Sequence, residues 1–139
     1  MSRAMRHPLD PMLGFHLVRT ANLALRAVNA AYGDLGIRHP DGAVLLVIDA
    51  NPGITQSSIG RLLNIQRSNI APMVSRLVDR GWLERRPGKG KTIGMFLTES
   101  GQRIMPAIHA ASTAGENMIT TSIGADAYAA TLETLKRLR

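Results

Sequence analysis

Cysteine is absent from this 139-residue sequence, which excludes disulfide bonds, thiol catalysis and the common structural zinc sites. No apolar run approaches the roughly 18 residues that a membrane-spanning helix needs. Residues 1–10 lack the apolar core of a signal peptide, and only 4% of all residues are aromatic. We therefore expect a single globular domain that resides in the cytoplasm.

The residue patterns that enzymes use are missing as well. The sequence has no phosphate-binding glycine motif, no Ser, His and Asp set with supporting context, and no pair of carboxylates on one predicted helix face. The four histidines, at positions 7, 16, 39 and 109, lack the spacing of metal ligands. These absences predict a protein that is not an enzyme and that needs no metal or cofactor.

Acidic residues are few, because ten Asp and Glu stand against 17 Lys and Arg, for a net charge of +7. The segment from Arg61 to Lys91 holds eight of the basic residues and two of the acidic ones. Charge concentrated in this way is typical of a surface that binds a polyanion such as DNA. Composition alone leaves open a solvated basic face that only improves solubility.

Residues 54–98 carry the pattern of a helix-turn-helix that runs into a β-hairpin. Thr55 is a capping residue for a short helix, which ends before a turn at 64–66. A second helix is expected from Arg67 to Arg80, and Gly81 is a stop signal. A helix pair of this kind fits the major groove of DNA.

The rest of the chain is predicted to be helical apart from the hairpin. Two short strands, 82–86 and 92–97, flank a Pro-Gly-Lys-Gly-Lys tip. Apolar residues at helical spacing predict further helices at residues 11–33, 39–50, 99–121 and from 124 onward. The expected fold is therefore mainly α with a small β-hairpin wing, a winged helix-turn-helix.

Three stretches together resemble the MarR (multiple antibiotic resistance regulator) family of bacterial transcription factors. They are Thr55–Leu63, Arg67–Arg86 and Leu97–Gly101, in this order and between long helices at both ends. The resemblance implies an obligate homodimer that represses nearby genes and leaves its operator, an inverted repeat, when a small aromatic or acidic effector binds. Residues 1–139 would form one such domain. Residues 11–33 and 99–139 would be its dimerisation helices, and 39–98 its DNA-binding lobe.

The candidate DNA-binding residues lie on the second helix of the motif and on the wing. Arg67 is placed to pair with guanine, and Asn69 or Gln66 with adenine. The hydroxyls of Ser68 and Ser75, with Arg76, suit phosphates. Pro72 either offers a small rigid surface to the groove or to a thymine methyl group, or is only a tolerated bend in the helix. The wing adds Arg85, Arg86, Lys89 and Lys91. Because Arg85 and Arg86 alternate along a strand, only one should face DNA, and the other is expected to pair with Glu84 or Asp79.

The wing departs from the family pattern, which has an Asp and an Arg two positions apart near the tip. Here those positions hold Lys89 and Lys91, so the fixed Asp–Arg geometry is missing. Either lysine can still neutralise phosphates or enter a narrow minor groove.

A second basic group is a candidate effector site for a carboxylate or an acyl-CoA thioester. It consists of Phe15, His16, Arg19, Arg26, Arg38 and His39. An exposed basic stripe without a ligand is the alternative for this group. For the protein as a whole, the alternative is a winged-helix module that binds protein or RNA and has no sequence-specific affinity for DNA.

Overall fold

The computed structural model describes residues 4–138. The described chain consists of six α-helices, a one-turn 3₁₀ helix and one antiparallel hairpin, which confirms the predicted fold class. In chain order the elements are α1 Leu13–Ala31, η1 Gly33–Leu35, α2 His39–Ala50, α3 Gln56–Leu63, α4 Arg67–Asp79, β1 Leu83–Pro87, β2 Ile93–Leu97, α5 Glu99–Ile123 and α6 Ala125–Lys136.

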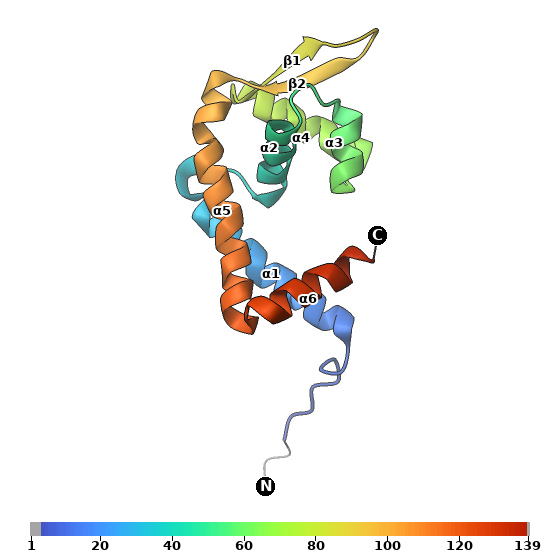
Figure 1. Ribbon diagram of the computed structural model, residues 1–139, viewed down its shortest axis with the longest axis vertical. Helices are drawn as coiled ribbons and strands as arrows, with labels where there is room; N and C mark the ends of the chain where they lie inside the picture. Colours follow the sequence, from blue (N-terminus) through green and yellow to red (C-terminus); the bar gives the residue numbers. More distant parts are fainter. Residues whose placement is uncertain (1–3, 139) are drawn as a thin grey trace.

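The elements form a lobe at one end of the molecule and a helical arm at the other (Figure 1). Helices α2, α3 and α4 and the hairpin make up the lobe, and the hairpin projects from it as a wing. Helix α5 begins at the base of the wing and runs down to the arm, where it packs along α1. Helix α6 then folds back across the arm. None of the described helices is long and apolar enough to cross a lipid bilayer.

Aliphatic side chains from every element of the lobe build its core. The fully buried members include Leu45 and Ile48 from α2, Ile59 from α3, Val74 and Leu77 from α4, and Leu83 and Met95 from the hairpin. Ile108 and Ala111 of α5 join this cluster. The wing base and the long helix are therefore fixed to the same core as the helix-turn-helix.

Threonine side chains cap two of the helices, as the sequence predicts. The Thr55 hydroxyl accepts a hydrogen bond from the Ser58 N–H at 3.2 Å, and the Thr98 hydroxyl accepts one from the Gly101 N–H at 3.0 Å. Gly81 follows α4 with a φ of 79°, a left-handed conformation that glycine adopts without steric cost. These caps fix where α3, α4 and α5 begin or end.

Helix α1 begins two residues later than predicted. Residues 8–11 form a turn, and Met12, in an extended conformation, takes the N-cap position without a side-chain cap. The Asp10 side chain does not cap the helix; its Oδ1 lies 3.8 Å from the His16 Nε2, which is also 2.7 Å from the Asp10 carbonyl oxygen. At the other end of the chain α5 extends to Ile123. Residues 1–3 and 139 of the predicted domain lie outside the described part.

Candidate nucleic-acid interface

The turn between α3 and α4 sets the two helices of the motif against each other. Asn64 has a φ of 53°, in the left-handed region. Asparagine is one of the few residue types other than glycine that tolerate this conformation. The next N–H, of Ile65, donates to the Gly60 carbonyl at 2.8 Å. A side chain at position 60 would lie 3.0 Å from the Ile65 carbonyl oxygen, so a glycine suits this close approach. Helix α4 therefore leaves the turn with its first residues at the surface.

Helix α4 has one buried face and one exposed face, and the candidate residues lie on the exposed one. Ile70, Met73, Val74 and Leu77 are buried, at i, i+3, i+4 and i+7 spacing. Gln66, Arg67, Ser68, Asn69, Pro72 and Arg76 are exposed, and Ser75 is half-buried.

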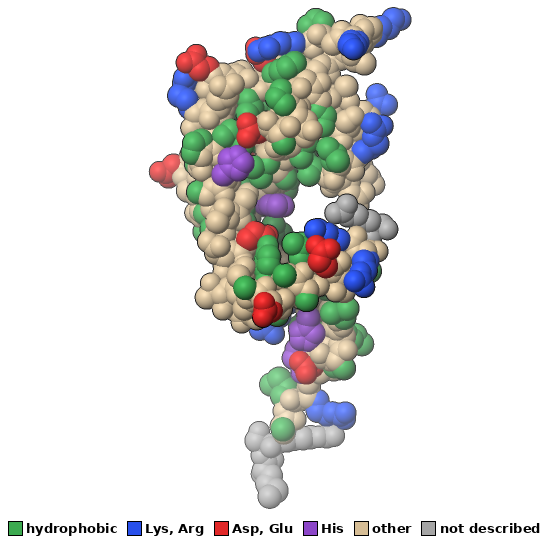
Figure 2. All heavy atoms as spheres, viewed as in Figure 1, with side chains coloured by type: hydrophobic (Ala, Val, Ile, Leu, Met, Phe, Trp, Pro, Cys, Tyr) green, Lys and Arg blue, Asp and Glu red, His purple; other side chains and the backbone are tan. Residues whose placement is uncertain are grey.

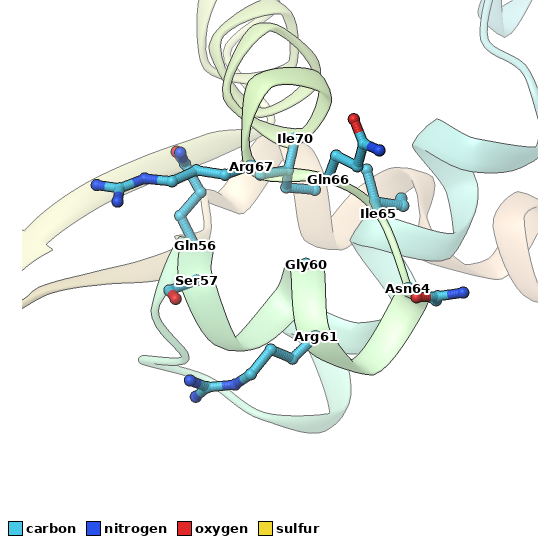
Figure 3. Close-up of a pocket in the computed structure, with 9 residues that line it drawn as sticks. All are labelled: Gln56, Ser57, Gly60, Arg61, Asn64, Ile65, Gln66, Arg67 and Ile70. Atoms are coloured by element: carbon cyan, nitrogen blue, oxygen red, sulfur yellow. The ribbon is translucent and has the colours of Figure 1, made fainter. Parts of the chain in front are cut away.

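A pocket of about 400 Å³ lies between α3 and α4 on this surface (Figure 3). Arg67 and Gln66 line it from α4, and Gln56, Ser57 and Arg61 line it from α3. In Figure 3 the side chains of Gln56, Arg61 and Arg67 extend toward one side of the pocket, although they come from two helices. The three α3 residues were missed in the sequence analysis. They lie in the first two turns of α3, directly before α4, the helix of the motif expected to enter the major groove (the recognition helix). This position in the sequence could have indicated them as candidate DNA contacts.

Arg76 and Asn69, two of the predicted DNA-binding residues, lie on the flank of α4 that faces α2. Arg76 forms an ion pair with Asp41 of α2, at 3.5 Å between Nη2 and Oδ1. Asn69 lines a mainly apolar hollow of about 390 Å³ with His39, Pro40 and Met73, on the flank of α4 that faces α2. Both side chains therefore lie on that flank rather than at the centre of the exposed face.

The wing separates its two arginines onto opposite faces, as strand alternation predicts. The guanidinium of Arg85 donates to the Ser75 hydroxyl of α4 at 3.2 Å, so Arg85 lies on the face of the wing that is turned toward α4. Arg86 pairs with Glu84 and lies 4.4 Å above the Phe96 ring. Glu84, rather than Asp79, is thus the acidic partner.

The tip of the wing carries the two lysines at its most exposed point. The backbone N–H of Gly88 donates to the Thr92 carbonyl at 2.8 Å, and the Thr92 hydroxyl donates to the Lys89 carbonyl at 2.6 Å. These bonds hold the tip in a defined turn, with Lys89 and Lys91 exposed. Figure 2 shows Lys and Arg side chains gathered at the end of the molecule that carries the wing and along the adjacent edge of the lobe.

Four of the six candidate effector residues fall into two separate groups in the chain. Phe15 and His16 lie near the start of α1, where their rings meet edge to face and His16 contacts Asp10. Arg38 and His39 lie at the start of α2, where the His39 N–H donates to the Asn29 side chain at 2.8 Å. The helical rise from residue 16 to residue 29 is about 20 Å. Among residues 4–138, no three His, Asp or Glu side chains cluster as metal ligands.

Comparison with known proteins finds relatives of this chain among transcriptional regulators. A family model described as the MarR family matches residues 35–91. YybA of Bacillus subtilis (strain 168), an uncharacterised HTH-type transcriptional regulator, is 24% identical over 98 residues, which are 66% of this chain and 65% of YybA. The chain therefore spans slightly less than two thirds of the length of that curated relative.

Solved structures match nearly the whole chain. The transcriptional repressor CouR bound to a 23-mer DNA duplex is 26% identical, with a TM-score of 0.88 and 99% of each chain covered. CouR bound to p-coumaroyl-CoA is 26% identical with a TM-score of 0.85 over 98% of this chain and 97% of that one. PcaV of Streptomyces coelicolor, in complex with its natural ligand, is 26% identical with a TM-score of 0.81 over 96% of each chain. Together with the match of the family model to residues 35–91, these likenesses show the winged-helix fold and support a transcriptional regulator of the MarR family.

Proposed function

We propose that the protein is a sequence-specific DNA-binding repressor, which acts in the cytoplasm as a homodimer on an inverted-repeat operator. The observation that carries this proposal is the joining of the wing to the recognition helix. Arg85 donates to Ser75, so the wing and the exposed face of α4 form one continuous surface. That surface lies in the segment with eight basic and two acidic residues. The matched proteins are transcriptional regulators, which favours a role other than catalysis.

The apolar surface of the arm supports the dimer. Large exposed apolar side chains recur along the arm: Leu13, Val18 and Leu23 on α1, Ile123 at the end of α5, Leu132 and Leu135 on α6, and Leu138 just after it. Several large exposed apolar side chains in one part of a molecule are typical of a protein interface. A homodimer buries it and sets two recognition helices at a fixed separation, so half-sites about one helical turn apart are expected. Residues 11–33 and 99–139 would then be the dimerisation helices, and 39–98 the DNA-binding lobe.

Replacement of Arg67 by alanine tests sequence-specific binding. A guanidinium that pairs with guanine contributes about 1–3 kcal/mol of discrimination against other bases. Arg67→Ala should therefore weaken operator binding by about fivefold to 150-fold and relax the preference at one base position. Gel shifts or fluorescence anisotropy against the selected operator and against its single-base variants measure both effects.

Arg103→Ala is the matched control, because Arg103 is an exposed arginine of α5 that pairs with Glu99, away from the proposed interface. It should leave both the affinity and the base preference unchanged. Equal losses on operator and random DNA with Arg67→Ala would refute base reading by this residue. A protein that shifts no duplex at any salt concentration would instead be a protein- or RNA-binding module.

A small anionic or aromatic effector is proposed to release the operator. His39 lines the mainly apolar hollow that Asn69 and Met73 of the recognition helix also line, and Arg38 precedes it at the start of α2. A hollow with such a lining suits an aromatic ring, and an adjacent arginine suits a carboxylate or a phosphate. The p-coumaroyl-CoA bound by CouR belongs to this ligand class. An effector at this place would favour one position of α4 and so shift the population away from the DNA-binding state.

Titration of aromatic acids and their CoA thioesters into the operator complex tests the effector. Release of DNA at ligand concentrations that also raise the melting temperature of the free protein is the expected result. Arg38→Ala should weaken the ligand effect while leaving operator affinity intact. If neither class of ligand changes melting temperature or operator affinity, the effector proposal fails and the DNA-binding proposal stands.

A further inference from the structure

Pro72 is an exposed proline in the interior of the recognition helix. Helix α4 runs without interruption from Arg67 to Asp79, although Pro72 cannot donate the hydrogen bond that the Ser68 carbonyl would receive in a regular helix. The side chain is exposed, so burial in the core does not compensate for the lost bond. A costly residue without a packing role is typical of a functional position.

Pro72 lies at the centre of the exposed face of α4. Ser68, Pro72 and Ser75, at i, i+4 and i+7, run opposite to the buried stripe of Ile70, Met73, Val74 and Leu77. The Ser75 hydroxyl already accepts a hydrogen bond from Arg85. Asp79 follows on the same face but in the last turn, whereas recognition helices read bases with their N-terminal turns.

The strong hydrogen-bonding groups of α4 lie on its flanks. Arg67 lines the pocket between α3 and α4, Asn69 lines the hollow beside α2, and Arg76 is paired with Asp41. The middle of the groove-facing surface therefore presents a proline ring, flanked by Ala71 and by the small side chain of Ser68. An apolar surface gains most from an apolar partner, and the only apolar group that base pairs present in the major groove is the C5-methyl group of thymine.

We propose that Pro72 is a specificity-determining residue, which reads one thymine methyl group in each half-site of the operator. This inference rests on the proposed DNA-binding function. It assigns the centre of the half-site to an A·T pair that is recognised through its methyl group, and it assigns hydrogen-bond readout to bases on either side. Burial of one methyl group against the ring corresponds to about a fourfold gain in affinity per half-site.

Deoxyuridine substitution tests the inference, because it removes only the methyl group. The preferred duplex is first selected from random sequences with the full-length protein, and each thymine in it is then replaced singly by deoxyuridine. At one thymine per half-site, replacement should weaken binding about fourfold, and about fifteenfold when both half-sites are changed. In Pro72→Ala the same replacements should have little further effect. Alanine is the best helix former, so this variant is expected to fold at least as well as the parent protein.

Pro106→Ala is the matched control, since Pro106 is also an exposed proline within a long helix, α5, away from the wing and α4. It should keep the full discrimination between thymine and deoxyuridine. If no thymine of the selected operator responds to methyl removal, or if the response persists in Pro72→Ala, the inference is wrong and the proposed function stands. If selection yields no preferred sequence, the proposed function itself fails.

Discussion

Tyr32 combines near-complete burial with a hydroxyl group that has no partner. Its exposed fraction is 3%, and among residues 4–138 its Oη is the only buried side-chain polar atom without a hydrogen bond. The hydroxyl lies against Gly42 of α2, where an added Cβ would meet it at 1.9 Å. An unsatisfied buried polar group costs about 1–3 kcal/mol, so this position is expected to limit the stability of the junction between α1 and the lobe.

Tyr32→Phe should therefore raise the free energy of unfolding by about 1 kcal/mol, because it removes the unpaired hydroxyl and keeps the ring. Urea or thermal denaturation followed by circular dichroism measures the change. Tyr128→Phe is the control, because the Tyr128 hydroxyl donates to Glu116 and its removal should give no gain. A loss of stability in Tyr32→Phe would mean that a solvent molecule satisfies the hydroxyl.

The same residue gives a pH dependence with a definite sign. Burial, with the nearby Asp41 carboxylate, raises the pKa of Tyr32 above its ordinary value of 10.0. Above pH 10 the unfolded chain loses this proton while the folded protein keeps it, so the free energy of unfolding falls as the pH rises further. Below pH 10 the effect is absent. Denaturation at pH 8 and at pH 10.5 should show a smaller fall in Tyr32→Phe than in the parent protein.

The secondary-structure elements differ in how far the sequence predicts them. Helices α2, α3 and α4 begin where the sequence places their first residues, because local signals such as Thr55 and Pro40 fix them. The start of α1 was misplaced, because Asp10 has the side chain of a capping residue but this side chain lies beside His16 and Met12 takes the N-cap position. The Arg76–Asp41 pair and the pocket lined by Gln56 and Arg67 depend on how helices pack. Such contacts between distant residues leave no periodic signal in a single sequence.

The contacts of the hairpin decide which of its two arginines is the better candidate for a DNA contact. Strand alternation left open whether Arg85 or Arg86 faces DNA, and the contact with Ser75 favours Arg85. We expect Arg85→Ala to weaken binding to all duplexes alike and to reduce the salt dependence by about one phosphate contact. Arg86→Ala should leave that slope unchanged, because its guanidinium already pairs with Glu84 and covers Phe96. Affinities measured between 50 mM and 200 mM salt compare the two variants, and identical slopes would refute the assignment.

The two ends of the protein carry opposite kinds of surface. The segment from Arg61 to Lys91, in the lobe and wing, holds eight of the 17 Lys and Arg and only two of the ten acidic residues, whereas the arm presents exposed apolar side chains such as Leu13 and Leu132. The long helix α5 belongs to both, since Ile108 lies in the core of the lobe and its C-terminal half packs against α1 and α6. A rigid element that spans both ends lets a change in the arm reposition the recognition helix. Dimerisation and DNA binding are thus expected to depend on each other.

Disruption of the arm surface tests this dependence. Leu135 and Leu132 line an apolar groove of about 210 Å³ between α5 and α6, and both are about 40% exposed in the single chain. A glutamate at such a position would be buried and unpaired twice in a symmetric dimer. Leu135→Glu should therefore give a monomer by analytical ultracentrifugation, with the helical content retained by circular dichroism. It should also bind the full operator no better than a single half-site.

Leu62→Glu is the control, because Leu62 is a 65% exposed leucine of α3 and lies outside the arm. That variant should remain dimeric. If Leu135→Glu still sediments as a dimer, the partner contacts must lie elsewhere, and the spacing argument for an inverted repeat loses its structural basis.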